Sequence, residues 1–290
     1  MLSMGHHPSG GWSLPLPLTI LLFALLALYL YGARKLPRAG LPAIARWRAA
    51  AGLTGLLILW AAVGSPLRSL DMQFLSAHMV QHLLLMTIAP ASILLGEPIL
   101  ALSRALPEPM VRTALVPAFG WAPLRAVGRF LVNPIVCWLA ASLTLLLWHV
   151  PAIFAFTLRS PALHTFQEAT FLVSGFLFWW PVLQPWPAVL DWPRWTILLY
   201  LFLATIPCDI LSAYLTFCDR IVYPYYLTLA GGTQLSASQD QQLAGALMWT
   251  SVTILYLLPA AMLTVRLLGP DPQNHAKGHI GNTRDVASQF

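Results

Sequence analysis

The segment LSAHMVQHLLLMTIAPASILL, residues 75–95, runs for 21 residues without an Asp, Glu, Lys or Arg. Crossing the hydrocarbon core of a bilayer takes roughly 20 such residues in a helix. An unpaired backbone group in lipid is costly, so a run of this length is expected to be helical. The sequence predicts an all-α, polytopic membrane helix bundle of about seven transmembrane helices, forming one domain over residues 1–268. The seven runs are 16–32, 47–64, 75–95, 131–150, 163–183, 195–217 and 243–265.

The composition also favours a protein whose main partner is a lipid bilayer. Hydrophobic residues make up 58% of the 290 residues and charged residues only 9%, which is too little polar side chain to cover a soluble globule. The net charge of +6 comes mostly from arginines in short connections, a topology signal that gives no reason to expect nucleic-acid binding. Three cysteines without a CxxC pair argue against a disulfide framework or a zinc ribbon.

The positive charges predict the orientation of the chain. Thirteen of the sixteen Lys and Arg residues lie in or beside one alternate set of connections, and only Arg68, Arg159 and Arg220 lie in the other. Because cytoplasmic loops carry the excess of positive charge, we expect the N-terminus outside and the C-terminus in the cytoplasm. Residues 269–290 are expected to form a disordered cytoplasmic tail.

Two histidines lie within the first two turns of the 75–95 run, and two methionines accompany them. His78 and His82 are four residues apart, so a helix places both imidazoles on one face. Met86 continues this stripe, and Met79 flanks it. Imidazole and thioether groups suit copper. Equally, a histidine pair in a membrane helix can hydrogen-bond a neighbouring helix, and a methionine stripe can serve packing alone.

Four more polar residues are expected at the same depth. His149 ends one predicted span on its outer side, His164 and Glu168 begin the next, and Asp240 precedes the last. Ionisable groups inside a membrane are costly and usually mark function. Random placement would scatter these residues in depth, so their agreement predicts a metal site near the outer face.

Two further features allow more than one interpretation. Asp209 follows Pro207 in the middle of the 195–217 run, where a buried carboxyl could relay protons or act as a hydrogen-bonded structural acid. The outer segment IVYPYYLTL, residues 221–229, contains three tyrosines. Tyrosines are enriched where membrane meets water, so we expect these three to be interface anchors.

Four motifs in this order resemble the seven-helix CtaG family of cytochrome c oxidase assembly factors. They are HMVQHLLLMTIAP (78–90), LWHVP (147–151), FLVSGFLFWWPVL (171–183) and DQQLAGALMW (240–249). The resemblance covers about residues 47–265 and implies a multi-pass protein of the bacterial plasma membrane that is not an enzyme. It further implies a role in bringing copper into a haem-copper oxidase, with the oxidase subunits and a periplasmic copper donor as partners.

The resemblance carries the family's motif positions onto His78, His82, His149 and Asp240. We expect the two histidines of the pair to be primary ligands, a methionine to be a soft ligand, and Asp240 to bond a ligand imidazole or attract the cation. Members of the family often have a histidine where this chain has Glu168, and a carboxylate favours copper(I) less than imidazole does. The candidate ligands and the residues that orient them are His78, His82, His149, His164, Glu168, Met79, Met86 and Asp240.

Two other functions stay open from the sequence. One is a haem-binding membrane cytochrome with histidines from facing helices as axial ligands. The other is a metal or proton transporter, although the inner halves of the spans are almost uniformly apolar. A retinal protein is excluded because Lys35 and Lys277 lie outside every predicted span, and no Ser or Cys nucleophile is placed beside a histidine for hydrolysis.

Overall fold

The computed structural model describes residues 14–35, 43–115, 117, 120–185, 192–193, 195–228 and 235–268. Within these ranges every regular element is a helix, which confirms the all-α prediction. Seven helices or helix pairs coincide with the predicted runs: α1 (Leu16–Arg34), α2 (Arg46–Gly64), α4 with α5 (Leu75–Leu83 and Ala89–Leu95), α10 (Pro134–Trp148), α12 (Pro161–Leu183), α13 (Trp195–Phe217) and α14 (Ala237–Leu268).

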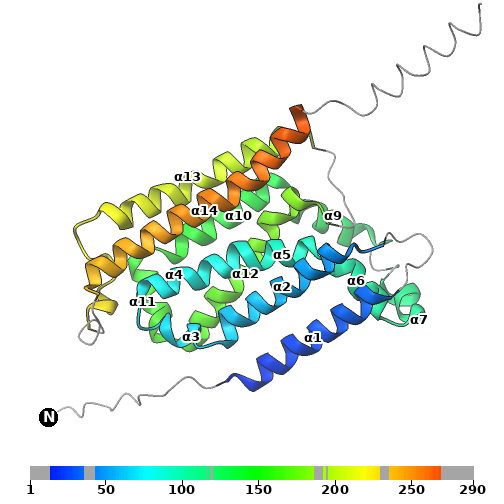
Figure 1. Ribbon diagram of the computed structural model, residues 1–290, viewed down its shortest axis with the longest axis horizontal. Coiled ribbons are helices and arrows are strands. Elements are labelled where there is room, and N and C mark those ends of the chain that lie inside the picture. Colours follow the sequence, from blue (N-terminus) through cyan, green and yellow to red (C-terminus); the bar gives the residue numbers. More distant parts are fainter. Residues whose placement is uncertain are drawn as a thin grey trace, which may run out of the picture.

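Shorter elements lie at the two ends of the bundle. At one end α3 (Leu67–Leu70), α11 (Pro151–Arg159) and the 3-10 helix η3 (Pro224–Thr228) lie near the start of α4 (Figure 1). At the other end are α6 (Pro98–Ala105), α7 (Glu108–Met110) and α9 (Ala122–Leu131). Two segments are π-helical: η1 (Leu84–Ile88), between α4 and α5, and η2 (Val111–Leu115), after α7.

Length and composition allow five of the described helices to cross a membrane: α1, α2, α4 continued through α5, α13 and α14. The pair α9 and α10, which is bent by 59°, allows a sixth. Helix α12 has 23 residues, but polar side chains in its first two turns, including His164, Gln167 and Glu168, lower its hydropathy. The count of seven spans and the orientation stay predictions. Arg38, Arg194, Lys277, Arg284 and the 269–290 tail lie outside the described residues.

The helix expected at 131–150 begins later than predicted. The side chain of Asn133 accepts a hydrogen bond from the backbone N–H of Ile135 at 2.9 Å, and Pro134 occupies the first helical position. Asparagine is a preferred N-cap and proline a preferred first residue, so these two residues start a new helix after α9 ends at Leu131.

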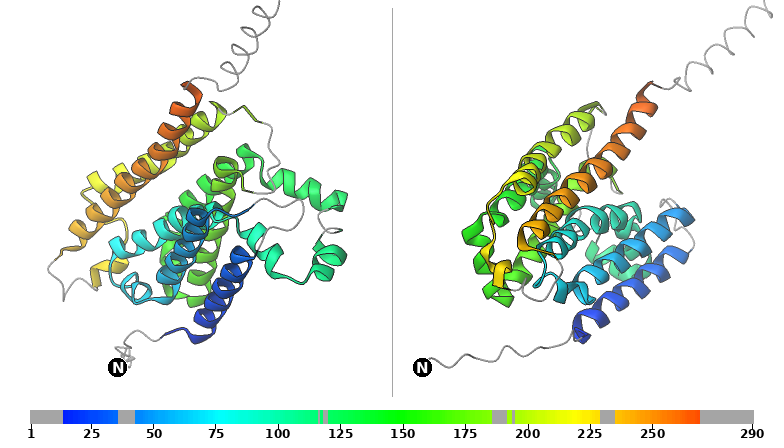
Figure 2. Two further views of the ribbon diagram at one scale, coloured as in Figure 1. Left: turned by 45° about the vertical axis from the view of Figure 1, so that its right-hand side comes forward. Right: turned by 60° about the vertical axis from the view of Figure 1, so that its left-hand side comes forward.

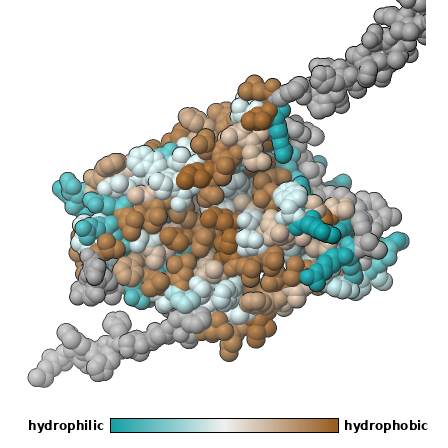
Figure 3. Space-filling model, in the orientation of Figure 1, coloured by the Kyte–Doolittle hydropathy of each residue, from teal (hydrophilic) through white to brown (hydrophobic). Residues whose placement is uncertain are grey.

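The surface supports a membrane setting. Figure 3 shows a belt of hydrophobic residues across the middle of the visible face, with hydrophilic residues gathered toward its two ends. Helices α13 and α14 lie side by side along one flank, and α1 packs on α2 and α6 along another (Figures 1 and 2). Large apolar side chains such as Ile20, Phe202 and Leu257 face outward, as lipid-facing residues do.

Close packing of α12 on the middle of the α4–α5 helix positions the candidate site. A Cβ on Gly175 would lie 2.5 Å from the carbonyl oxygen of Met86, so only glycine permits this approach. Just past that contact, Pro90 has no N–H to donate to Met86, and the π-helical segment η1 lies before it. Such segments frequently occur at functional sites.

Candidate metal centre

Four histidines from three separate parts of the chain converge at one end of the bundle. His78 and His82 lie on α4, His149 follows α10, and His164 lies in the first turn of α12. Each is no more than 5% exposed. The ring centroid of His78 lies 4.1 Å from that of His82 and 5.6 Å from that of His164, and the rings of His82 and His149 are 6.3 Å apart. The structure brings these histidines together, and their role as ligands stays a prediction.

Asp71, between α3 and α4, is a member of this group that the sequence analysis missed. One carboxylate oxygen of Asp71 and one ring nitrogen each of His78 and His164 all lie within 4.8 Å of one another. Asp71 Oδ2 is 3.4 Å from His164 Nε2. The residue lies four positions before the 75–95 run, in a connection judged only by its positive charge. The sequence did contain a signal for Asp71, because this acid lies so close to the outer end of the helix that carries the histidines.

The polar atoms of this group lack hydrogen-bonding partners among the residues that the structure describes. They are both carboxylate oxygens of Asp71, both ring nitrogens of His78 and His82, and Nε2 of His164, all buried. About 90% or more of buried polar groups in proteins have a partner, so this concentration calls for a ligand such as an ion or ordered water. Imidazole with carboxylate suits copper(II), zinc or iron.

The electrostatic environment of Asp71 also favours a cation. Burial, and then the nearby negative charge of Glu168, raises the pKa of Asp71 to about 7, and Arg68 acts in the opposite direction. Arg68 Nη2 lies 3.4 Å from Glu168 Oε2, so this arginine is shared between two acids. When Asp71 is ionised, a cation bound beside it would neutralise its negative charge.

Glu168 is in contact with protein groups through both of its carboxylate oxygens. Its Oε1 accepts a hydrogen bond from Gln81 Nε2 at 2.8 Å and lies 3.7 Å from His164 Nδ1. Its other oxygen faces Arg68. Because Glu168 faces Nδ1 of His164, the opposite nitrogen, Nε2, is directed at Asp71.

His149 forms a different kind of pair with Met79. His149 Nδ1 lies 2.7 Å from the carbonyl oxygen of Leu145, and a carbonyl can only accept, so Nδ1 carries the hydrogen and donates it. In the neutral ring, Nε2 then has a free lone pair, and it lies 3.4 Å from Met79 Sδ. Met79 is completely buried.

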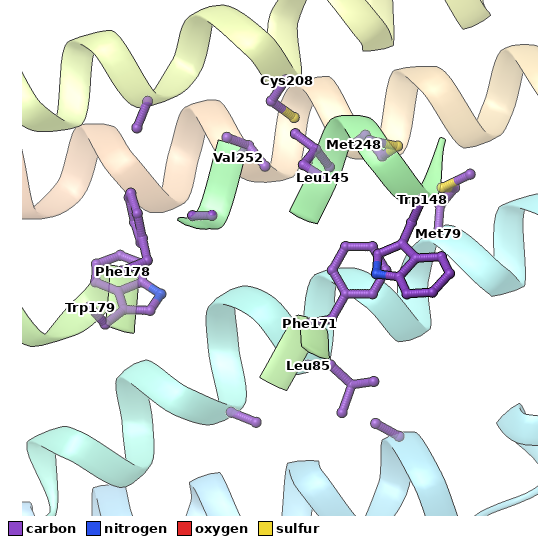
Figure 4. Close-up of a cluster of buried hydrophobic side chains, with 14 of the residues drawn as sticks. Met79, Leu85, Leu145, Trp148, Phe171, Phe178, Trp179, Cys208, Met248 and Val252 are labelled. Atoms are coloured by element: carbon purple, nitrogen blue, oxygen red, sulfur yellow. The ribbon is translucent and has the colours of Figure 1, made fainter. Parts of the chain in front are cut away.

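A cavity of about 40 Å³ extends from this pair into the bundle. His82 and Met86 also line it, so the predicted ligand Met86 lies on the same cavity as Met79. Figure 4 shows Met79 with the facing side chains Met248 and Cys208, whose sulfur atoms come from α14 and α13; both residues also line the cavity. Asp209, next to Cys208, is not among the residues that line it.

Asp240 does not make the imidazole bond that was one of its two expected roles, and its attraction for a cation stays a prediction. Its carboxylate accepts hydrogen bonds from the backbone N–H groups of Leu75 at 2.6 Å and Ser76 at 3.2 Å, and from the Ser76 hydroxyl. Both oxygens are therefore occupied at the N-terminus of α4, and the expected bond to an imidazole is not made. A carboxylate at this position satisfies free N–H groups and opposes the helix dipole, so Asp240 fixes the start of the helix that carries His78.

Two of the three tyrosines expected as surface anchors are buried over the site, so the prediction is wrong for them. The Tyr223 hydroxyl donates to the His149 carbonyl at 3.0 Å, and the Tyr226 hydroxyl donates to the Asp71 carbonyl at 2.9 Å. The ring of Phe154 lies 4.3 Å from that of Tyr223 and 4.9 Å from that of His78. These aromatic residues cover the histidines at the end of the bundle, a contact that no local sequence pattern reveals.

Comparison with known proteins gives a family match over most of the chain. The family model described as cytochrome c oxidase caa3 assembly factor matches residues 27–269. Similar curated sequences include uncharacterized proteins of Mycobacterium bovis and Mycobacterium tuberculosis, each 28% identical over 231 residues, and one of Mycobacterium leprae, 25% identical. Each alignment covers 76% of this chain and 33% of the relative, so the chain spans about a third of the length of these relatives. No solved structure gives a significant match.

Proposed function

The chain belongs to the cytochrome c oxidase caa3 assembly factor family, and from this premise we propose that it holds copper for the oxidase at Asp71, His78 and His164. We call these three residues the outer cluster. In this proposal the protein lies in the bacterial plasma membrane, receives copper from a periplasmic donor and passes it to an oxidase subunit. The role is one of binding and release, and the proposal includes no catalysis.

The observation that carries the proposal is the set of unpaired polar atoms in the outer cluster. A buried carboxylate without a partner is costly, and the cost falls when a cation is bound beside it. Three protein ligands leave a coordination position open, as in zinc sites that exchange their fourth ligand. An open position suits a site that must give up its metal.

The geometry supports an ion more than a haem. The cavity beside His82 has a volume of about 40 Å³, which is far too small for a porphyrin.

The inner end of the cavity supports holding over transport. Phe178 lines the cavity and stacks between Tyr200 and Tyr256, with ring centroids 5.1 and 5.0 Å apart. Rings stacked in this way leave little room for a hydrated ion. This packing therefore favours holding over transport.

The test uses a host that makes a caa3-type oxidase and lacks this protein. We expect the wild-type chain to restore the copper content of the purified oxidase, and the His78→Asn/His164→Asn variant to leave it copper-deficient. The control is Val173→Ala, a change on the exposed face of the same helix α12. Full copper content with the double variant present at normal levels would contradict the proposal.

A further inference from the structure

We infer that the protein has a second metal site, selective for copper(I), formed by Met79, His82 and His149. We call these residues the inner site. The inference rests on the proposed function for the identity of the metal, while none of its three residues belongs to the outer cluster. Its donors are one thioether and two imidazoles, whereas the outer cluster has two imidazoles and a carboxylate.

The contact between His149 and Met79 is not a hydrogen bond. The hydrogen of the neutral His149 ring is on Nδ1, because that atom lies 2.7 Å from the Leu145 carbonyl. A thioether has no hydrogen to donate, so Nε2 and Sδ direct lone pairs at each other across 3.4 Å. Both atoms can act as metal ligands, and no proton lies between them. A metal ion can bind to both lone pairs at once.

The separation of these two atoms fits joint coordination. Typical metal–ligand bonds are about 2.0 Å to imidazole nitrogen and about 2.3 Å to sulfur. Two such ligands at tetrahedral or trigonal angles lie roughly 3.5 to 3.7 Å apart. The 3.4 Å in the structure therefore requires only a small adjustment on binding.

His82 is placed to be the third donor. Both of its ring nitrogens are buried without a hydrogen-bonding partner in the described chain. Its centroid lies 6.3 Å from that of His149, whereas two imidazoles on one ion at tetrahedral or trigonal angles have centroids roughly 5.1 to 5.5 Å apart, so binding would draw these two rings about 1 Å closer. The ring packs on Phe171 at 4.1 Å and lies at the same centroid distance from His78, so His82 is the member of the inner site that adjoins the outer cluster.

The surroundings select copper(I) over divalent ions. None of the residues that line the adjoining cavity in the described chain is an acid, and three of them, Met86, Met248 and Cys208, add sulfur to its wall. Figure 4 shows Met248 and Cys208. Soft thioether and imidazole ligands favour copper(I). Neutral ligands in an apolar cavity also stabilise a single positive charge with less cost than a double one.

The test is X-ray absorption spectroscopy at the copper edge, on full-length protein purified in detergent and loaded with copper(I) under anaerobic, reducing conditions. We expect a sulfur neighbour at about 2.3 Å in the wild type and its loss in Met79→Leu. In the same Met79→Leu variant, the affinity for copper(I), measured by competition with a chromophoric chelator, should fall at least tenfold. Even changes to residues that only support a metal ligand typically cost about tenfold or more in affinity. Leucine conserves the volume of methionine, so the variant should fold.

Two control variants sharpen the result. Met262→Leu removes an exposed thioether on α14, and Cys208→Ser removes the thiol from the cavity wall; both should keep the sulfur neighbour. A wild type without a sulfur neighbour, or a sulfur neighbour that persists in Met79→Leu, would overturn the inner site.

The same spectra separate this inference from the proposed function. The outer cluster has no sulfur donor, and imidazole with carboxylate suits copper(II). An Asp71→Asn/His164→Asn variant should therefore lose copper after a second loading with copper(II), yet keep the sulfur neighbour after loading with copper(I). If that variant loses no copper, the outer cluster is wrong and the inner site stands. If the variant loses copper while the wild type shows no sulfur neighbour, the inner site is wrong and the outer cluster stands.

Discussion

At the residue scale, the outer cluster combines groups that destabilise the protein when no ion is bound. Asp71 is buried, and its nearest side-chain partner, His164 Nε2, lies 3.4 Å from Oδ2, which is long for a hydrogen bond; both ring nitrogens of His78 have no hydrogen-bonding partner among the described residues. Such atoms cost free energy in the folded state. Their presence together is typical of a site in which function is retained at the expense of stability.

Replacing Asp71 with asparagine should separate the cost of this residue in stability from its contribution to metal binding. Folding raises the pKa of Asp71 from 3.8 to about 7, so the folded protein favours the neutral acid. The stabilising contribution of the protonated group is present below pH 4, declines as the pH rises to 7 and is absent above it. At pH 8 without metal, we expect Asp71→Asn to raise the thermal midpoint of the detergent-purified protein. The difference should shrink towards pH 4.

Metal affinity should change in the opposite direction, because asparagine removes the anionic ligand. Zinc binding, followed by titration calorimetry at pH 7, should weaken at least tenfold in the same variant, the lower bound for disturbing such a site. An Asp71→Asn protein that is less stable without metal at pH 8, or that binds zinc as tightly as the wild type, would contradict this account of Asp71.

At the element scale, close helix contacts hold the donors in place. Asp240 fixes the start of α4, and Gly175 allows α12 to approach η1. The ligands on α4 and α12 therefore depend on residues that contact no ligand. Sub-ångström displacements matter at metal sites, so these supports should be visible in both stability and affinity.

A methyl group at Gly175 should separate α12 from η1. In Gly175→Ala the new Cβ would meet the backbone of Met86, which cannot move aside as a side chain can. Overpacking of this kind costs about 1 to 3 kcal/mol, so the thermal midpoint should fall by several degrees. Gly128→Ala is the matched control, because its Cβ would meet nothing within 4 Å. Equal midpoints for the two variants would show that the close approach of α12 is not required.

The elements also show what sequence can predict. Apolar runs of fixed length identified the long helices because each run must bury its own backbone in lipid. The same reasoning placed His78 and His82 on one face, since helical spacing is local. Asp240 and Tyr226 were misjudged because their partners, Leu75 and Asp71, are remote in sequence. No pattern of length or periodicity contains those contacts.

At the scale of the whole molecule, aromatic residues flank the site at two ends. Tyr223 and Tyr226 cover it at the end of the bundle, and Phe178 with its stacked neighbours lies at the inner end of the cavity. The tyrosine cover therefore lies on a route by which a metal ion would enter or leave. Two hydrogen bonds to backbone carbonyls hold these tyrosines in place, and a partner protein could break them.

Removing both hydroxyls should speed metal exchange without changing capacity. In Tyr223→Phe/Tyr226→Phe the rings remain but the two hydrogen bonds are lost, so the cover should open more often. We expect copper to leave to an added chelator about tenfold faster, equivalent to roughly 1.4 kcal/mol for two ordinary hydrogen bonds, at unchanged stoichiometry. Tyr31→Phe, an exposed tyrosine on α1, is the control. Release at the wild-type rate would mean that these tyrosines do not limit access.

The central claim is that the outer cluster binds copper. Its most direct test is the copper content of detergent-purified protein after copper loading and removal of excess, measured by mass spectrometry for the wild type and for His78→Asn/His164→Asn. The account predicts at least one copper per wild-type chain and a loss of about one in the variant, with both proteins eluting as folded species of equal size. The same copper content in both proteins, or none in the wild type, would contradict it.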